Sequence, residues 1–518
     1  MNGAHALAAT LADSGVTAVF ANPGTSEMHF VAALDSAPAL RGVLCLFEGV
    51  ATGAADGYGR MAGGPAATLL HLGPGLANGL ANLHNARKAC TPVVNVVGDH
   101  ATYHKRYDAP LESDIDALAG AVSGWVRRPS RPEDVGPDAA EAVAASRGGG
   151  GCIATLILPA DVSWGKDAAV APARPTRPLP GVPDPVVGAV AGVLKGGEPA
   201  VILLGGAALR EPALSAAARI ASHTGATVLT ETFAARLERG AGRPSFPRLG
   251  YFAEQAGAQL VGARHLVLAG AASPVAFFAY PQQPSDLVPP GARVHHLAGP
   301  AEDVAAALEE LAERVGAAAP PAVPAGGGGR VALPRGPLDP AGIGAALRAE
   351  MPEGAIVVDE AITAGMAIAA GTTGAAPHDW LALMGGAIGQ GLPLGTGAAV
   401  ACPDRRVVCL EADGSAMYTI QALWTQAREG LDVTTVLIHN QAYAILQIEM
   451  HRVQAEPPGP TAASLLDLSP PVIDAVSLAR GFGVPAEQVA TAGELRAALA
   501  RSFAQPGPCL IEAVVGRR

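Results

Sequence analysis

Two oxygen-bearing side chains near the C-terminus each follow an apolar run of strand character. Asp413 comes shortly after residues 406–411, Asn440 comes shortly after residues 433–438, and a helical pattern from Ala416 to Arg428 lies between them. Because the carboxyl ends of neighbouring parallel strands meet at one edge of a sheet, we expect the carboxylate and the amide oxygen to lie side by side. Hard oxygen ligands suit Mg²⁺, which retains waters and shares phosphate oxygens. The pattern therefore predicts a magnesium–phosphate site.

The residues after Asp413 favour a phosphate at the same place. Gly414 allows close approach of the backbone, and the helix that follows, from Ala416 onward, offers N–H groups without helical partners to an anion. A simpler interpretation is that Asp413 caps its helix and Asn440 forms a turn. Either residue alone fits both interpretations, and only the pair favours the phosphate site.

The pair and its 27-residue interval resemble the GDG…NN signature of thiamine diphosphate enzymes. Ala412 replaces the usual first Gly and His439 replaces the first Asn, and neither change removes an expected metal ligand. The resemblance implies that thiamine diphosphate is bound through Mg²⁺, with the backbone carbonyl of Ala442 as a third protein ligand beside Asp413 and Asn440. It also implies further cofactor contacts from Gly414, Ser415 and Tyr443.

A glutamate near the N-terminus, Glu48, would complete a thiamine site. Thiamine chemistry requires removal of the C2 proton of a thiazolium ring. The family achieves this with a glutamate that hydrogen-bonds the aminopyrimidine, while the cofactor serves as the electron sink. Glu48 follows the apolar run 43–47 and precedes a helix of small residues, and this stretch resembles the family's activating segment. The alternative is a carboxylate stabilised only by the dipole of that helix.

The resemblance covers nearly the whole chain and adds segments at 22–27, 71–75, 360–363 and 385–393. Ile388 falls where the family places a bulky apolar residue that forces a bent cofactor conformation. The Gly386 carbonyl is expected to face the amino group of the pyrimidine. Glu360 and Thr363 align with a loop that touches the cofactor, and Thr363 is expected to reach the diphosphate.

The reaction that this resemblance implies begins with the decarboxylation of a 2-oxo acid. The enamine that remains is protonated to an aldehyde, as in benzoylformate decarboxylase, or ligated to a second carbonyl, as in acetolactate synthase. The acceptor in the second case is an aldehyde or another oxo acid. Because the cofactor motifs are common to both outcomes, only residues that face the substrate can separate them.

His71 and Thr25 are the candidate substrate-facing residues. His71 stands just before a glycine loop, as does a histidine that assists proton transfer in benzoylformate decarboxylase, and imidazole suits that work near neutral pH. The alternative is a core histidine at the end of a strand. Thr25 occupies the position of that enzyme's substrate-binding serine, and residues 109–111 resemble its apolar stretch. The predicted catalytic residues are therefore Glu48, His71 and Thr25.

One feature favours ligation instead. Ala279 stands near the place of the decarboxylase's second catalytic histidine. Without that proton relay the enamine would live longer, or protonation would pass to His100 or His104, for which a solvated loop is the alternative interpretation. Two further functions stay open. One is a flavin-linked 2-oxo acid oxidase, although residues 185–315 contain no convincing flavin segment, and the other is a non-catalytic, cofactor-binding regulatory subunit, which would not need Glu48.

The elements that must position these residues divide into three parts. Two stretches rich in Pro, Gly and Ala, 171–184 and 316–339, cannot sustain a helix or a central strand and are predicted linkers. They separate a pyrimidine-binding domain (1–170), a central domain (185–315) and a diphosphate-binding domain (340–518). Each part alternates short apolar runs with helical patterns. The sequence therefore predicts an α/β fold with three doubly wound parallel sheets.

Composition restricts the partners. A net charge of −11 excludes a general nucleic-acid or anionic-membrane surface, and 49% hydrophobic residues indicate a folded protein. Six cysteines without CxxC spacing are typical of reduced thiols, and neither a signal peptide nor a membrane span is evident. We expect a cytoplasmic enzyme that binds a small 2-oxo acid. The resemblance implies a homodimer or homotetramer, with Glu48 of one chain at the metal site of another.

Overall fold

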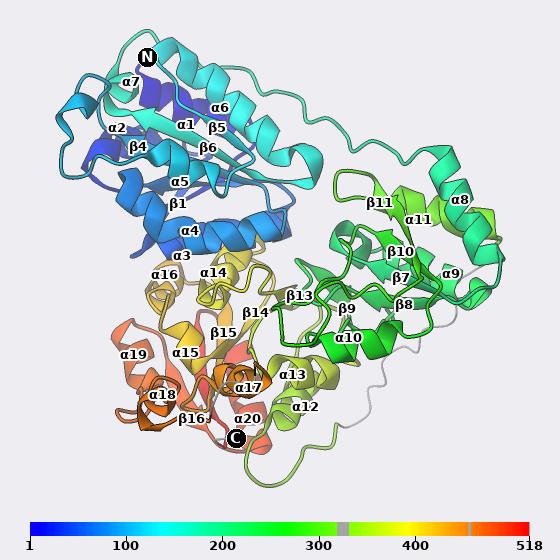
Figure 1. The fold of residues 1–518 in the computed structure, drawn as a ribbon. Coiled ribbons are helices and arrows are strands. Elements are labelled where there is room, and N and C mark those ends of the chain that lie inside the picture. The colour runs from blue at the N-terminus through cyan, green and yellow to red at the C-terminus, as the bar shows by residue number, and fades with distance from the viewer. Residues whose placement is uncertain (319–330, 454–456, 517–518) are drawn as a thin grey trace.

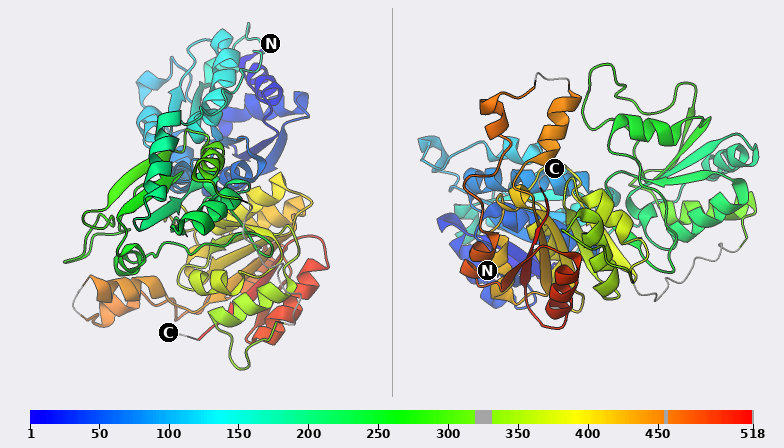
Figure 2. Two further views of the ribbon diagram at one scale, coloured as in Figure 1. Left: turned by 90° about the vertical axis from the view of Figure 1, so that its right-hand side faces the viewer. Right: turned by 90° about the horizontal axis from the view of Figure 1, so that it is seen from below.

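Three α/β units make up the chain, each built round one sheet (Figure 1). The computed structural model describes residues 1–318, 331–453 and 457–516, so the stretch 319–330 of the predicted second linker lies outside the described residues. The central unit stands to one side of the other two (Figure 2). The predicted α/β class with three doubly wound, mainly parallel sheets is confirmed.

The N-terminal sheet is six-stranded and wholly parallel, in the order β2-β1-β3-β4-β6-β5. Val19 and Val94 face the core under α1 and α6, whereas Phe20 and Val93 face the core under α3 and α4. Both faces of the sheet are therefore covered, which explains why its inner strands are buried and mainly apolar. The strands are β1 (Ala18–Asn22), β2 (Arg41–Leu44), β3 (Ala66–Leu70), β4 (Val93–Asp99), β5 (Trp125–Arg127) and β6 (Ile153–Pro159). The helices are α1 (Gly3–Asp13), α2 (Met28–Ala33), α3 (Glu48–Ala62), α4 (Leu72–Lys88), α5 (Ile115–Gly120), α6 (Pro132–Arg147) and α7 (Ala160–Trp164).

The central sheet has four parallel strands in the order β11-β10-β7-β8. No helix or strand is formed between Gly165 and Pro183, so the predicted first linker lies in an irregular segment. The elements of this unit are α8 (Asp184–Lys195), β7 (Ala200–Leu204), α9 (Ala213–Thr224), β8 (Thr227–Thr230), α10 (Ala253–Leu260), β10 (His265–Ala269), β11 (Arg293–Ala298) and α11 (Val304–Val315).

The C-terminal sheet has seven strands in the order β16-β17-β15-β14-β12-β13-β9. Its edge strand β9 (Leu237–Arg239) comes from the predicted central domain and pairs antiparallel with β13, so the two units share a sheet. The strands are β12 (Ile356–Glu360), β13 (His378–Ala382), β14 (Val407–Ala412), β15 (Val433–His439), β16 (Ala486–Val489) and β17 (Cys509–Val514). The helices are α12 (Pro340–Glu350), α13 (Gly365–Gly371), α14 (Gly391–Ala401), α15 (Asp413–Ala416), α16 (Ala422–Glu429), α17 (Ala444–Arg452), α18 (Pro460–Ser464), α19 (Ala475–Gly481) and α20 (Ala492–Phe503).

The predicted helix from Ala416 to Arg428 is interrupted. It forms the short α15, a turn through Ile420, and then α16. In the turn, Tyr418 and Thr419 donate backbone N–H groups to carbonyls three residues earlier, and the Thr419 hydroxyl donates to the Gly389 carbonyl at 2.9 Å. A tertiary hydrogen bond thus replaces helical continuity at this position.

Helices α3 and α14 cross with their backbones in contact, and this crossing joins the N-terminal and C-terminal units. A methyl group at Gly57 would lie 2.0 Å from the Leu394 carbonyl oxygen, and one at Gly397 would lie 1.7 Å from the Ala54 carbonyl oxygen. The abundance of small residues in both helices is therefore a packing requirement. Among the described helices, none combines the length and the apolar character that crossing a bilayer requires.

A buried ion pair on α3 ties all three units together. Arg60 donates to both carboxylate oxygens of Asp56, and it also donates to the backbone carbonyls of Ala235 and Ala382. Asp56 is fully buried and accepts further bonds from Thr91 and Gln390, each at 2.6 Å. Because each charge is paired and hydrogen-bonded, the network holds the units in one arrangement without an uncompensated buried ion.

Candidate active site

The α3–α14 crossing brings the glutamate segment and the glycine-rich loop 385–391 together. Glu48 begins α3, and the loop leads directly into α14. Asn82 of α4 donates its amide to the Gly49 carbonyl at 2.8 Å and to the Gly389 carbonyl at 3.2 Å. One buried side chain therefore fixes the start of α3, the helix that Glu48 begins, against the loop.

Two further α4 side chains hold the same loop. His84 contacts the Gly385 carbonyl at 3.2 Å. Asn85 donates to the Ala387 carbonyl at 2.8 Å and accepts from the Ala387 N–H at 3.2 Å. In the sequence Asn82, His84 and Asn85 look like ordinary polar positions of a helix, and sequence reasoning missed them.

Glu48 and His71 both lie next to Gly75. Glu48 is 8% exposed, and its Oε2 accepts from the Asn78 amide at 3.0 Å. A methyl group at Gly75 would lie 3.1 Å from Glu48 Oε1 and 3.3 Å from His71 Cβ. The structure thus places two of the three predicted catalytic residues side by side, with Gly75 leaving the space between them open.

His71 lies at the end of β3 and precedes α4. Its ring packs against Gly24, where a side chain would overlap the imidazole, and its Nδ1 lies 2.9 Å from Glu27 Oε2. Thr25 is exposed at the start of the short 3₁₀ helix η1 (Thr25–Glu27). Glu27 is a partner of His71 that sequence reasoning missed.

The two other candidate proton donors lie on the loop after β4. His100 is half-buried, and burial lowers its pKa, with the neighbouring charges of His104, Lys105 and His71 acting in the same direction. His104 is exposed, and its ring centroid lies 5.3 Å from that of His100. His100 is therefore within electrostatic reach of His71, whereas His104 lies on the solvent side.

The loop 385–391 is held from behind by a buried carboxylate. Glu360 ends β12, is 1% exposed, and accepts from the backbone N–H groups of Gly389, at 2.6 Å, and of Gly391. Burial raises the pKa of Glu360, and it raises the pKa of the neighbouring Glu411 as well. In this structure Glu360 supports the loop, while Thr363 is exposed in the turn that follows.

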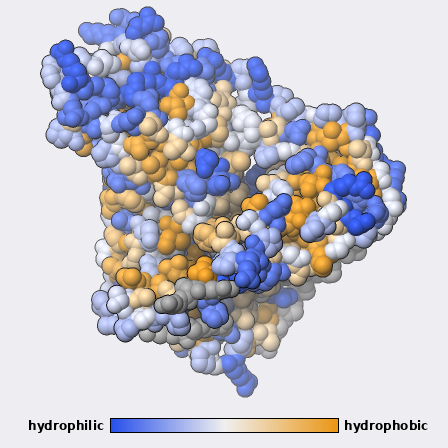
Figure 3. All heavy atoms as spheres, viewed as in Figure 1, coloured by the Kyte–Doolittle hydropathy of each residue, from blue (hydrophilic) through white to orange (hydrophobic). Residues whose placement is uncertain are grey.

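The outer side of the loop faces aromatic rings. Gly386 has φ +74°, and a methyl group there would lie 2.9 Å from Phe277 Cζ, while Ile388 is half-buried. Phe277 packs against three further rings, with centroids 4.8–5.8 Å apart: Phe233, Tyr251 and Phe278. The segment that carries Ala279 therefore borders the loop. On the face shown in Figure 3 the surface is hollowed where the central unit meets the other two.

Helix α17, which follows the predicted metal ligands, docks on the central unit at the start of α10 and at Tyr280. Arg452 donates to both oxygens of Glu254 at 2.7 and 2.8 Å and lies 3.9 Å from the centroid of Phe252. The Tyr280 hydroxyl donates to Glu449 at 2.9 Å. In the right-hand view of Figure 2, α17 reaches toward the central unit. These contacts join the metal end of the site to its aromatic wall.

Asp413 and Asn440 lie together at the carboxyl edge of the C-terminal sheet, as their spacing predicts. Asp413 is 3% exposed, and its Oδ2 accepts from the backbone N–H groups of Asn440 at 3.0 Å and Gln441 at 2.7 Å. Asn440 Oδ1 accepts from Ala442 N–H at 3.1 Å. A methyl group at Gly414 would lie 2.5 Å from the ring of Tyr443, which covers that glycine, and Ser415 is buried.

These residues fit a magnesium ion. Burial raises the pKa of Asp413, which accepts from the backbone N–H groups of Gly414, Asn440 and Gln441, so a divalent cation would further stabilise its charged form. A carboxylate, an amide oxygen and a backbone carbonyl are the hard ligands that Mg²⁺ prefers. Across the ranges that the structure describes, no group of three or more His, Cys, Asp and Glu residues is placed to hold a metal.

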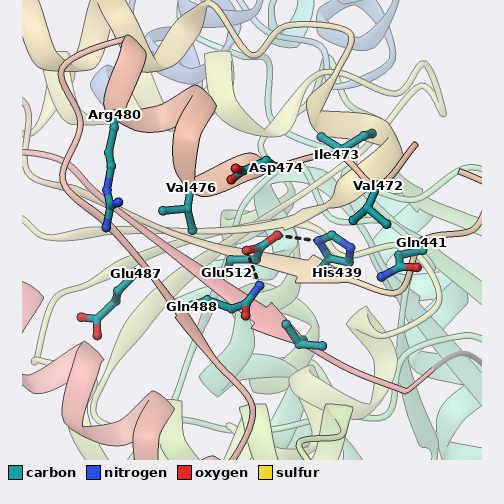
Figure 4. Close-up of a pocket in the computed structure, with 11 residues that line it drawn as sticks. His439, Gln441, Val472, Ile473, Asp474, Val476, Arg480, Glu487, Gln488 and Glu512 are labelled. Carbon is teal, nitrogen blue, oxygen red and sulfur yellow. Dashed lines mark hydrogen bonds and ion pairs between the residues drawn. The ribbon is translucent and has the colours of Figure 1, made fainter. Parts of the chain in front are cut away.

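A cavity of about 630 Å³ adjoins this edge on the side of β16 (Figure 4). His439 Nδ1 lies 2.5 Å from Glu512 Oε1, and Gln488 donates to Glu512 Oε2 at 2.8 Å. Hydrogen bonding to Glu512 raises the pKa of His439. Although His439 departs from the family's usual Asn, it is anchored to the neighbouring strand and supports the backbone from which Asn440 projects.

A helix headed by a buried glutamate, a glycine loop beneath it and an Asp–Asn pair at two strand ends together define a thiamine diphosphate enzyme. The chain belongs to the thiamine pyrophosphate enzyme family, thiamine pyrophosphate being another name for this cofactor. Residues 1–119 match the family's N-terminal TPP binding domain, and residues 363–513 match its C-terminal TPP binding domain.

Relatives of the chain carry the names of two kinds of enzyme, acetolactate synthases and benzoylformate-type decarboxylases. The chain is 61% identical, over 99% of both chains, to a Mycobacterium tuberculosis protein with the provisional name acetolactate synthase large subunit IlvX. It is 29% identical, over 96% of both chains, to benzoylformate decarboxylase of Pseudomonas aeruginosa. Among solved structures, Rhodococcus jostii 4-hydroxybenzoylformate decarboxylase matches with a TM-score of 0.85, 27% identity and full coverage of both chains.

Proposed function

We propose that this enzyme decarboxylates a 2-oxo acid with thiamine diphosphate and Mg²⁺. The observation that carries the proposal is the double hydrogen bond of Asn82, which fixes the Glu48 end of α3 against the loop 385–391. A protein that only bound the cofactor would not need an activating carboxylate at that place. The adjacent His71 adds a group that can move a proton.

Each residue has a distinct task in this proposal. Bound thiamine diphosphate would supply a carbon nucleophile and an electron sink for the electron pair that the departing CO₂ leaves on the substrate carbon. Asp413, Asn440 and the Ala442 carbonyl hold the metal that binds the diphosphate. Glu48 holds a proton at the aminopyrimidine, and Ile388 and the Gly386 carbonyl position that ring. His71 delivers a proton to the carbon from which CO₂ has left, and Thr25 binds the substrate carboxylate.

Ligation to a second carbonyl is the second candidate outcome. It is favoured by Ala279, which cannot transfer a proton and which lies two residues from Phe277 at the edge of the loop. The name of the 61% identical relative, an acetolactate synthase, is in line with it. The names of the two decarboxylase relatives favour aldehyde release. Both outcomes share the first carbon–carbon cleavage and differ only in what meets the resulting carbanion equivalent.

An assay of the purified enzyme with both cofactors tests the proposal. The substrates are pyruvate, benzoylformate and indolepyruvate, each with and without added benzaldehyde. Release of an aldehyde supports protonation, and formation of an acyloin or acetohydroxy acid supports ligation. Hydrogen peroxide would indicate the oxidase, and no turnover of any substrate would overturn the proposal in favour of the regulatory subunit.

The Glu48→Gln variant sharpens this test. It keeps the hydrogen bond from Asn78 but cannot share a proton with the cofactor as a carboxylate does. We expect thiamine diphosphate binding to remain within a few-fold by calorimetry, while turnover falls by about 10²-fold or more. The exposed Glu353 provides the matched control, and Glu353→Gln is expected to behave as the wild type. Wild-type turnover of Glu48→Gln would refute the assigned role.

A further inference from the structure

The carboxylate of Glu27 is built into the wall of the site behind His71. It is 3% exposed and belongs to η1, 44 residues before the histidine. Its Oε2 accepts from Gly24 N–H at 2.8 Å and lies 2.9 Å from His71 Nδ1. Its Oε1 accepts from the Ser26 hydroxyl. Both oxygens are therefore held in place beside the imidazole.

Two glycines make the room that this pair needs. A methyl group at Gly98, inside the buried strand β4, would lie 1.7 Å from Glu27 Oε1. A methyl group at Gly24 would lie 2.1 Å from the His71 ring. A glycine in a strand interior weakens the strand unless another group approaches closely. Here the approaching group is the Glu27 carboxylate, so the backbone is adapted to the pair.

We propose that Glu27 is the positioning residue for His71. A carboxylate next to Nδ1 keeps a proton on that nitrogen and leaves Nε2 as the ring atom that exchanges a proton with the substrate. The same logic governs the carboxylate of the Ser-His-Asp triad, which holds the tautomer and orientation of its histidine. The inference rests on the proposed function, because it assigns to Glu27 the orientation of the residue that moves the proton.

Other charged and titratable groups face the same histidine. Glu48 approaches from α3 across Gly75, and His100 approaches from the loop after β4. Around His100 stand Glu112, His104 and Lys105. Since these groups are unchanged in a Glu27 variant, the difference between the pH profiles of variant and wild type reports the Glu27 carboxylate.

The test uses the full-length enzyme with both cofactors and the oxo acid, from pyruvate, benzoylformate and indolepyruvate, that it turns over fastest. Glu27→Gln is expected to lower kcat by about 10–10²-fold with little change in KM, because only proton transfer is impaired. The alkaline limb of its kcat profile should move to lower pH, since the protonated ring no longer faces an anion. Glu27→Asp should recover part of the loss, and the exposed Glu133→Gln is the matched control.

A double variant separates positioning from a structural role. If Glu27 acts through His71, adding Glu27→Gln to His71→Ala causes no further loss in kcat. If the two residues act independently, the fold losses in kcat of the single variants multiply in the double variant. Multiplying losses, or an unmoved profile in Glu27→Gln, overturn the inference. If Glu27→Gln does not fold, Glu27→Asp replaces it: the shorter carboxylate keeps the charge but not its reach to the ring, so kcat should fall below the wild type, and a wild-type kcat overturns the inference equally.

The failure of the inference is distinguishable from the failure of the proposed function. If His71→Ala leaves turnover unchanged, the proton-transfer role of His71 fails and the Glu27 inference fails with it. If His71→Ala slows turnover while Glu27→Gln equals the wild type in kcat and in pH profile, only the positioning role of Glu27 is refuted.

Discussion

Substituting Gly397 by Ala should separate the two halves of the candidate site. The added methyl group would lie 1.7 Å from the Ala54 carbonyl oxygen, where ordinary contact begins at 3.4 Å. The obstacle is backbone of α3, not the end of a flexible side chain, so helices α3 and α14 must move apart by roughly 1.7 Å or bend. Because Glu48 begins one helix and the loop 385–391 leads into the other, the movement acts directly on their distance.

The expected magnitude follows from this geometry. Overpacking of a closed interface costs about 1–3 kcal/mol of unfolding free energy. A misplacement of about 1 Å between reacting groups can cost about 10²-fold in rate. We therefore expect Gly397→Ala to lose about 1–3 kcal/mol of stability and at least about 10-fold in kcat. Gly57→Ala, on the opposite helix, should have the same kind of effect, since its methyl group would lie 2.0 Å from the Leu394 carbonyl oxygen.

Urea unfolding measures the first quantity, and steady-state kinetics with saturating cofactors measures the second. Gly192, in the middle of α8, is the control, because a methyl group there meets nothing within 4 Å. Gly192→Ala should gain up to about 1 kcal/mol through helix propensity and leave kcat unchanged. If Gly397→Ala and Gly57→Ala both match the wild type in stability and kcat, the close helix crossing does not assemble the active site, and the reasoning is wrong.

Three other perturbations have clear expected outcomes. Asp413→Asn keeps an oxygen for the neighbouring N–H groups but loses the charge, so thiamine diphosphate should bind at least about 10-fold more weakly and without dependence on Mg²⁺, as calorimetry with and without the metal would show. Phe277→Ala opens the aromatic wall and should raise KM for benzoylformate more than for pyruvate; equal changes would place the substrate elsewhere. Burial raises the pKa of Glu231 from 4.5 to about 7. The folded chain therefore holds a proton that the unfolded chain has lost, and stability falls as pH rises through this window, so Glu231→Gln should stabilise more at pH 8 than at pH 5 in urea unfolding.

The sequence is most informative where a strand ends. Parallel strands carry near-continuous apolar runs, and the first polar residues beyond them, Asp413 and Asn440, necessarily share an edge. Glu48 is recognisable for a similar reason, since it lies between an apolar run and a helix of small residues. The three-sheet architecture follows from the same alternation of runs and helices. All of these features are determined by residues that are close together in the sequence, so the sequence alone can predict them.

The side chains that hold the loop 385–391 in place cannot be recognised from their neighbours in the sequence. Asn82 and Asn85 are polar positions on a helix, and nothing in their local pattern indicates that they bind backbone carbonyls more than 300 residues away. The pairing of β9 with β13 in the C-terminal sheet likewise joins residues that are far apart in the sequence. Glu27 had one signal that could have been used. Gly98 interrupts a fully buried strand, and a glycine in that setting indicates the close approach of another group.

The residues of the sequence motifs and the residues that hold those motifs in place are different sets in the structure. The motif residues closest to the expected cofactor are mostly backbone or small, as at Gly386 and Gly389, both with positive φ. Their geometry is imposed from behind by Glu360, Asn82 and Thr419, whose side chains bind the N–H and carbonyl groups of the loop. Because the loop is held by side chains that bind its backbone, we expect substitutions of those supporting side chains to be tolerated less well than substitutions on the exposed side of the loop. Residues proposed to face the substrate, such as His71 and Ala279, can then be changed while the loop keeps its position.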